Sequence, residues 1–266
     1  MTKYPQIKIN MNNETISYEE INRWAVKRAV HVLQEISELG GELYLNDTLL
    51  NPLKLHELSN EELLNACAET KVKLGFEKIQ SLYSDLLAQG AQMFKDIQQN
   101  KNSNNLKETH VQVEVDGVDP SMIAKMITTD SHDDLNINVA YGLHPEHFIF
   151  KLHGTTQEVM ENIGTYKFPL HFKLELKDHN VEAPGELRSD AIATTLAKVY
   201  LIDDGFDTGV YAMHQFIKKD NGMIVDLGLY VPENTPDEFL IGHREHFAIE
   251  FGNLFKNIIN MMNLQK

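Results

Sequence analysis

The first hundred residues carry apolar side chains at the spacing of α-helices. One apolar stripe of helical period covers Ser17–Gly40, and a second covers Ser59–Gln99. Both begin with a serine that is followed three residues later by a glutamate, the spacing of a capping box. Gly75 and Gly90 are candidate breaks in the second stripe, because glycine weakens a helix. The pattern therefore predicts a helical region over residues 1–105, and the alternating Ile7, Ile9 and Met11 before its first helix favour a short strand.

After the Asn- and Ser-rich stretch 101–107, the pattern changes to the alternation of strands. THVQVEV and FPLHFKLEL alternate apolar and polar residues, Asp220–Asn221–Gly222 predicts a hairpin turn, and a long helix is expected over Asp237–Met262. The chain is thus predicted to be α+β, with the helical region 1–105 followed by a domain over 106–266. In that domain a curved antiparallel sheet would wrap around the C-terminal helix, in a helix-grip like that of START and Bet v 1 proteins. Such a fold would leave an apolar cavity for a small molecule.

Charge and composition narrow the classes of partner. The 266 residues have a formal net charge of −15, which repels phosphate groups and argues against nucleic acid or an anionic membrane as the main partner. The chain has no run of about 18 apolar residues, and its start, MTKYPQIKINMNN, lacks the apolar stretch of a secretory signal. The one cysteine, Cys67, excludes an internal disulfide and is expected to be a buried structural residue. We therefore expect a cytoplasmic protein with a small-molecule partner.

A histidine and a glutamate four residues apart lie on the same face of a helix, where both can bind one metal ion. His246 and Glu250 have this spacing on the predicted C-terminal helix. His243 is a rival of His246, but it lies two turns from Glu250, about 10 Å of helix rise, which is too far to share an ion. Spacing alone does not single out the last pair, since three others share it: His31/Glu35, His110/Glu114 and His171/Glu175.

Residues 117–262 carry an ordered set of motifs. GVDPSMIAKMI is followed by His132 and then by YGLHPEHF, EVMENIG, YAMHQF and HFAIEFGNL. This ordered set resembles the zinc-dependent 2,4-diacetylphloroglucinol hydrolase and phloretin hydrolase family. The order and approximate spacings of these motifs are similar to those of the family. Residues 1–105 have no counterpart in it. The family's metal-binding histidine usually sits among tryptophans, whereas Trp24 is the only tryptophan here.

The resemblance implies a metal site and a reaction. The implied metal ligands are His132, Glu161, His246 and Glu250. Two imidazoles and two carboxylates suit Zn²⁺, although Mn²⁺ or Fe²⁺ is not excluded. The family hydrolyses the carbon–carbon bond between an aromatic ring and an acyl group, so the implied substrate is an acylated polyphenol or a similar ketone. His214 would bind a substrate hydroxyl or shuttle protons, and Tyr230 would be a second polar contact.

Several alternatives stay open. His144, His147 and His153 cluster in HPEHFIFKLH and are the rivals of His132 for the first ligand position, although the resemblance favours His132. The same pocket could hydrolyse an ester or an amide. The protein could also be a non-catalytic carrier of a small molecule, or a helical protein-interaction module. Residues 1–105 are expected either to cover the cavity or to form a homodimer contact, and the sequence does not choose between these roles.

Overall fold

The computed structural model describes residues 7–120, 141–154, 156–162, 168–177 and 182–264. The helices are α1 (Tyr18–Glu38), α2 (Asn60–Leu82), α3 (Ser84–Gln99), α6 (Asp237–Leu264) and the short 3-10 helix η1 (Pro52–Glu57). The strands are β1 (Ile7–Met11), β2 (Glu14–Ile16), β3 (Leu43–Leu45), β4 (Thr48–Leu50), β5 (Leu106–Asp116), β6 (His147–His153), β7 (Thr156–Glu161), β8 (Leu170–Leu176), β9 (Ala191–Leu201), β10 (Asp207–Lys219) and β11 (Gly222–Pro232).

Nine of these strands form one sheet in the order β2-β1-β5-β11-β10-β9-β8-β7-β6, in which every neighbouring pair is antiparallel. The alternation predicted for THVQVEV is confirmed in β5, because Val111, Val113 and Val115 are buried while the residues between them are partly exposed. The predicted turn at Asp220–Asn221–Gly222 is also confirmed and joins β10 to β11. The sheet begins at β1 and β2, so the strand expected from the alternation of Ile7, Ile9 and Met11 is present ahead of the helices of the region 1–105.

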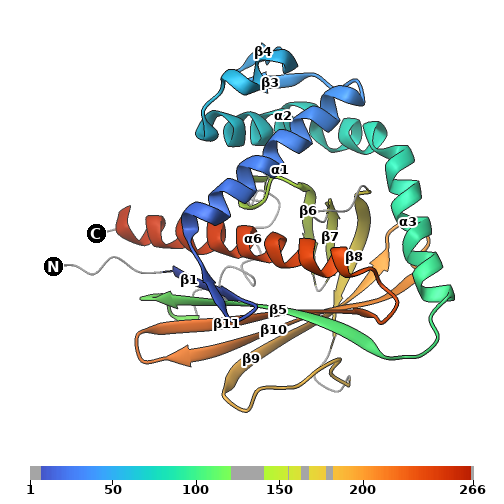
Figure 1. The fold of residues 1–266 in the computed structure, drawn as a ribbon, viewed down its shortest axis with the longest axis vertical. Coiled ribbons are helices and arrows are strands. Elements are labelled where there is room, and N and C mark those ends of the chain that lie inside the picture. The colour runs from blue at the N-terminus through green and yellow to red at the C-terminus, as the bar shows by residue number, and fades with distance from the viewer. Residues whose placement is uncertain (1–6, 121–140, 155, 163–167, 178–181, 265–266) are drawn as a thin grey trace.

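The helix-grip prediction is wrong. The nine-stranded sheet is large and not strongly curled, so it does not wrap around α6, and α6 is only one of several long helices (Figure 1). α6 packs on β5 and β1, α1 packs on α6 and α2, and α2 and α3 reach β6, β8 and β10. Alternating side chains indicate which face of a strand is buried, but they do not determine how far a sheet curls. The pattern also could not show that α1 would pack on α6 and α2, or that α2 and α3 would reach the sheet that α6 covers.

The helix boundaries follow the caps predicted from the sequence. A serine caps the start of α1 and of α2, and at α2 Ser59 and Glu62 form the complete capping box. Gly75, with φ of 71°, interrupts the helical backbone of α2, as predicted. Gly90 does not interrupt α3. A Cβ atom at Gly90 would lie 2.6 Å from the carbonyl oxygen of Pro169, so glycine allows α3 to approach the chain that leads into β8.

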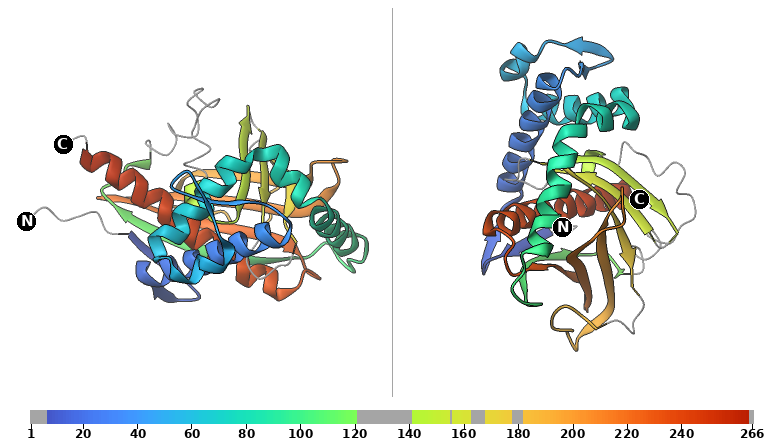
Figure 2. Two further views of the ribbon diagram at one scale, coloured as in Figure 1. Left: turned by 90° about the horizontal axis from the view of Figure 1, so that it is seen from above. Right: turned by 90° about the vertical axis from the view of Figure 1, so that its right-hand side faces the viewer.

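Two apolar cores hold the helices on the sheet. The first lies between α6 and the long strands and includes Ile21 and Phe94 from the helices of the first hundred residues. The second involves α1, α2 and the β6–β7 hairpin, whose arrangement is seen in Figures 1 and 2. It includes Phe148 and Met160. The N-terminal helices therefore share their cores with the sheet. Within the described parts of the chain, no helix has the length and apolar character needed to cross a membrane.

Candidate metal centre

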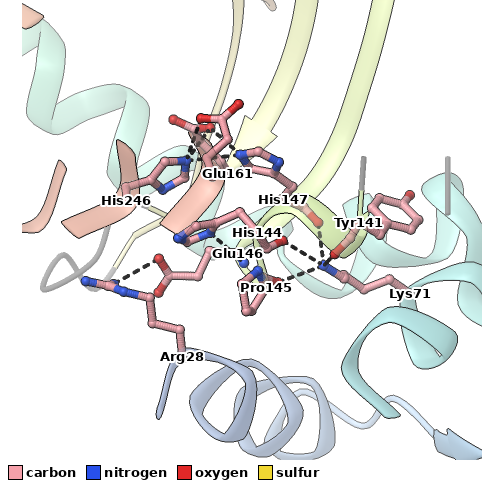
Figure 3. Close-up of polar contacts among 10 residues, drawn as sticks. Arg28, Lys71, Tyr141, His144, Pro145, Glu146, His147, Glu161 and His246 are labelled. Carbon is pink, nitrogen blue, oxygen red and sulfur yellow. Dashed lines mark hydrogen bonds and ion pairs between the residues drawn. The ribbon is translucent and has the colours of Figure 1, made fainter. Parts of the chain in front are cut away.

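Four side chains that can bind a metal ion meet where the β6–β7 hairpin faces α6. His147 begins β6 and Glu161 ends β7, and the two residues are register partners in the antiparallel hairpin. His246 and Glu250 lie one turn apart on α6, so both side chains leave the same face of the helix. Figure 3 shows Glu161 between the rings of His147 and His246.

The separations between donor atoms match those of a tetrahedral metal site. Nε2 of His147 lies 3.0 Å from Nε2 of His246, and Oε2 of Glu161 lies 3.6 Å from the first nitrogen and 3.5 Å from the second. Oε2 of Glu250 lies 3.8 Å from Nε2 of His246. Two ligands bound at about 2.1 Å to a tetrahedral ion are about 3.4 Å apart. The observed separations lie on both sides of that value, so His147, His246 and Glu161 could hold a small divalent cation, with Glu250 beside His246.

Burial keeps the imidazole of His246 in the protonation state that a metal requires. His147 and His246 are each 1% exposed, and Glu161 is 6% exposed. Burial lowers the pKa of His246 well below its usual value, and the nearby His147 and His243 lower it further, so the ring is neutral at pH 7. Burial raises the pKa of Glu161 well above its usual range, and the carboxylate of Glu250 raises it further. A bound cation would offset the unfavourable burial of both carboxylates.

His144 completes a buried cluster of three histidines. Ring nitrogens of His144, His147 and His246 lie within 4.8 Å of one another, so the cluster could hold a metal ion. The rings of His144 and His246 stack with centroids 3.8 Å apart, and Nδ1 of His144 accepts the backbone N–H of Glu146 at 3.1 Å. That hydrogen bond places the ring proton of neutral His144 on Nε2. A metal bound at Nε2 would need an imidazolate, so the geometry favours His144 as a support for His246 rather than a donor.

Two buried cations from the N-terminal helices lie against this cluster. Arg28 of α1 donates from Nη1 to Glu146 at 3.0 Å and from Nη2 to Glu245 at 2.5 Å. Lys71 of α2 donates to main-chain carbonyl oxygens of the segment 141–147 (Figure 3). Burial lowers the pKa of Lys71 to about 8, which leaves the amine mainly protonated at pH 7. The segment that presents the cluster is therefore held by charge from α1 and α2.

The structure brings together three of the four predicted metal ligands. Glu161, His246 and Glu250 meet at the centre, although they come from β7 and α6, far apart in the sequence. His132, the predicted first ligand, lies outside the described residues. His147, which the sequence left as a rival of His132, occupies the position beside Glu161 and His246.

The two predicted substrate-binding residues do not lie together. His214 of β10 is partly buried under α6, where its ring meets the edge of Phe247 at a centroid distance of 5.3 Å, and desolvation lowers its pKa to about 4. His214 is the register partner of Leu227, and Tyr230 is three positions further along β11, so Tyr230 points to the opposite face of the sheet. There the hydroxyl of Tyr230 lies 3.3 Å from Nε2 of His110.

Arg28 and Lys71 were missed in the sequence, although a signal for them exists. Arg28 lies seven residues after Ile21, and Lys71 lies four residues after Cys67, so each has the phase of a core-facing position on its helix. Cys67 is buried, as predicted. Burying a cation on the apolar face of a helix is costly unless the cation is paired. Their place on such a face could therefore have identified both residues as buried cations with partners.

Comparison with known proteins does not assign the chain to a family. Models of known protein families were searched and none matches the chain, and no curated protein matches it either. The resemblance to the diacetylphloroglucinol and phloretin hydrolases therefore stays a prediction.

Proposed function

We propose that the protein is a metal-dependent hydrolase. The proposed metal ligands are His147, Glu161, His246 and Glu250. The observation that carries the proposal is the convergence of these donors from three elements of the fold: donor atoms of His147, Glu161 and His246 lie 3.0–3.6 Å from one another, and Oε2 of Glu250 lies 3.8 Å from Nε2 of His246. Two imidazoles and two carboxylates favour Zn²⁺ among the common divalent ions. Zinc held by these residues would need one further coordination position for water, where it would supply a hydroxide nucleophile near pH 7, and it would polarise a carbonyl oxygen.

The proposed substrate is a ketone in which an acyl group is attached to a hydroxylated aromatic ring. This choice rests on the motifs that resemble the phloroglucinol hydrolases. Water would add its hydroxyl to the acyl carbon and a proton to the ring carbon, so that the carbon–carbon bond breaks and leaves a carboxylic acid and the free arene. Ring hydroxyls make the arene a possible leaving group, because the ring can tautomerise to a ketone before attack.

His214 and His243 are the residues that we propose bind the substrate. Both lie against Phe247 of α6, and the Nδ1 atom of each is buried without a hydrogen-bond partner among the described residues. Burial lowers the pKa of His214 to about 4 and that of His243 to about 3. Both rings are therefore neutral near pH 7, where each can donate or accept a hydrogen bond with a phenolic hydroxyl but is a weak base. Tyr230 has no part in this site, since it faces away from it.

Metal analysis of the purified protein tests the proposal. We expect about one zinc ion per chain after incubation with Zn²⁺ and desalting, loss of that zinc in His246→Ala, and full zinc content in the control His214→Ala. An acylated phloroglucinol and a phenyl ester then separate the substrate classes. Wild-type protein that binds no zinc would refute the metal centre and leave a non-catalytic carrier. Cleavage of the ester alone would retain the hydrolase and exclude the ketone as substrate.

A further inference from the structure

Lys71 reaches the proposed metal centre from α2, a helix that carries none of the proposed ligands. Its side chain is fully buried, with a relative exposure of 0%. Its Nζ atom contacts four main-chain carbonyl oxygens: Tyr141 at 3.5 Å, His144 at 3.4 Å, Pro145 at 2.7 Å and His147 at 2.8 Å. The ring of Tyr141 also lies 4.9 Å from Nζ. The chain from Tyr141 to His147 thus turns around one ammonium group (Figure 3).

This turn determines where two histidines of the cluster lie. His144 and His147 are both in the turn, and the carbonyl oxygen of each contacts Lys71. The ring of His147 must reach to 3.0 Å from that of His246, and an imidazole has only two side-chain torsions to correct a misplaced backbone. A methionine could fill a similar apolar volume without burying a charge. Packing in the core therefore does not explain the ammonium group, whereas hydrogen bonding to several main-chain carbonyl oxygens does.

We propose that Lys71 is a positioning residue of the metal centre, holding the turn 141–147 in the shape that directs His147 toward His246 and Glu161. The inference rests on the proposed function, because it assigns Lys71 to the same metal site. It also gives the N-terminal helices a role that the sequence could not specify. α2 contributes a group without which the ligands would be present but incorrectly placed.

Arg28 makes a comparable connection on the other side of the cluster. Its guanidinium joins Glu146, which lies inside the turn, to Glu245, which precedes His246 on α6. One cation of α1 therefore links the segment that carries His147 to the helix that carries His246. Lys71 fixes the shape of the turn, and Arg28 fixes its distance from α6.

The affinity of the full-length protein for Zn²⁺ tests the role of Lys71. Lys71→Met removes the ammonium and keeps an unbranched side chain. We expect its Kd for Zn²⁺, measured by competition with a chromophoric chelator, to be about 10- to 100-fold weaker than that of the wild type. The absorption spectrum of the Co²⁺-loaded variant should also change, because misplaced ligands alter the coordination geometry. A role in stability alone would lower the melting temperature and leave the Co²⁺ spectrum of the folded protein as it is.

Lys73→Met is the matched control, because Lys73 lies on the same helix with its side chain 41% exposed and pairs with Asp47 at the surface. Its Kd and Co²⁺ spectrum should equal those of the wild type. If Lys71→Met does not fold, Lys71→Ala with added propylammonium decides the question. Recovery of both the fold and the Zn²⁺ affinity supports the inference, and recovery of the fold without the affinity overturns it.

The outcomes separate this inference from the proposed function. Wild-type protein without affinity for Zn²⁺ overturns the proposed function and the role of Lys71 together. Wild-type protein that binds Zn²⁺, with an unchanged Kd and Co²⁺ spectrum in folded Lys71→Met, overturns the role of Lys71 alone.

Discussion

The choice of the first metal ligand leads to a prediction that the structure makes quantitative. Nε2 of His147 lies within 3.6 Å of donor atoms of His246 and Glu161, whereas His144 uses Nδ1 to accept a backbone N–H. Replacing His147 with alanine should remove a ligand. Replacing His144 with phenylalanine should keep the ring that stacks on His246 and remove only a supporting hydrogen bond.

The expected losses differ by about a factor of ten. Zinc sites with four protein ligands bind the ion with a free energy of about 10–16 kcal/mol, or about 3 kcal/mol for each ligand. Loss of one ligand in His147→Ala should therefore weaken the Kd roughly 100-fold. Loss of a supporting group beyond the ligands typically weakens binding about 10- to 100-fold, and His144→Phe should lie near the lower limit because it retains the stacking.

Chelator competition at pH 7 measures both affinities, and elemental analysis measures the zinc content. His132→Ala belongs in the same series, because the sequence motifs favour that residue as the first ligand. We expect His132→Ala to retain zinc. Wild-type affinity in His147→Ala together with zinc loss in His132→Ala would refute our reasoning from the geometry and restore the ligand set that the motifs predicted.

Two further predictions concern buried and partly buried charges. Arg28→Met should lower the free energy of unfolding of the metal-free protein by about 3 kcal/mol in urea titrations, because it removes the guanidinium partner of Glu146, which is 1% exposed. The His110–Asp226 pair should make the free energy of unfolding depend on pH, because the hydrogen bond to Asp226 raises the pKa of His110 in the folded protein. The stabilisation by this pair is complete below pH 6.5, the pKa of an unfolded histidine. It is lost as the pH rises through the higher pKa of the folded state. The destabilisation caused by His110→Asn should therefore be larger at pH 6 than at pH 8.5, by about 0.5 kcal/mol after allowance for solvent screening, since a third of the side chain is exposed.

Each of these predictions has a control. Lys73→Met removes an ion pair with Asp47 that is open to solvent, and it should cost less than about 1 kcal/mol. A similar loss in Arg28→Met would show that the buried pair contributes no more than a surface pair. For the pH dependence, Asp226→Asn should remove most of the difference between pH 6 and pH 8.5. An undiminished difference in that variant would assign the effect to other groups.

The parts of the fold that could be predicted from the sequence are those that local chemistry determines. Ser59 and Glu62 cap α2 through groups three residues apart, and the alternating valines of β5 indicate its buried face whatever the strand pairs with. The curl of the sheet was predicted wrongly because it depends on how nine strands twist together and on what covers them, neither of which an alternating pattern contains.

The candidate site was predictable to a similar extent. The spacing of His246 and Glu250 places them on one face of any helix, so their proximity needed no tertiary information. His147 required knowledge that β6 pairs with β7 in the register that sets it opposite Glu161. Lys71 required knowledge of a contact across more than seventy residues, between a helix and the main chain of a turn.

His246 comes 99 positions after His147 in the sequence, which has a consequence for how the protein is made. During synthesis, the β6–β7 hairpin leaves the ribosome long before α6 does, so a nascent chain exposes only half of the proposed zinc site. A metal ion bound as proposed would therefore meet all four ligands only after translation has passed residue 250, and until then the early half would bind an ion only weakly.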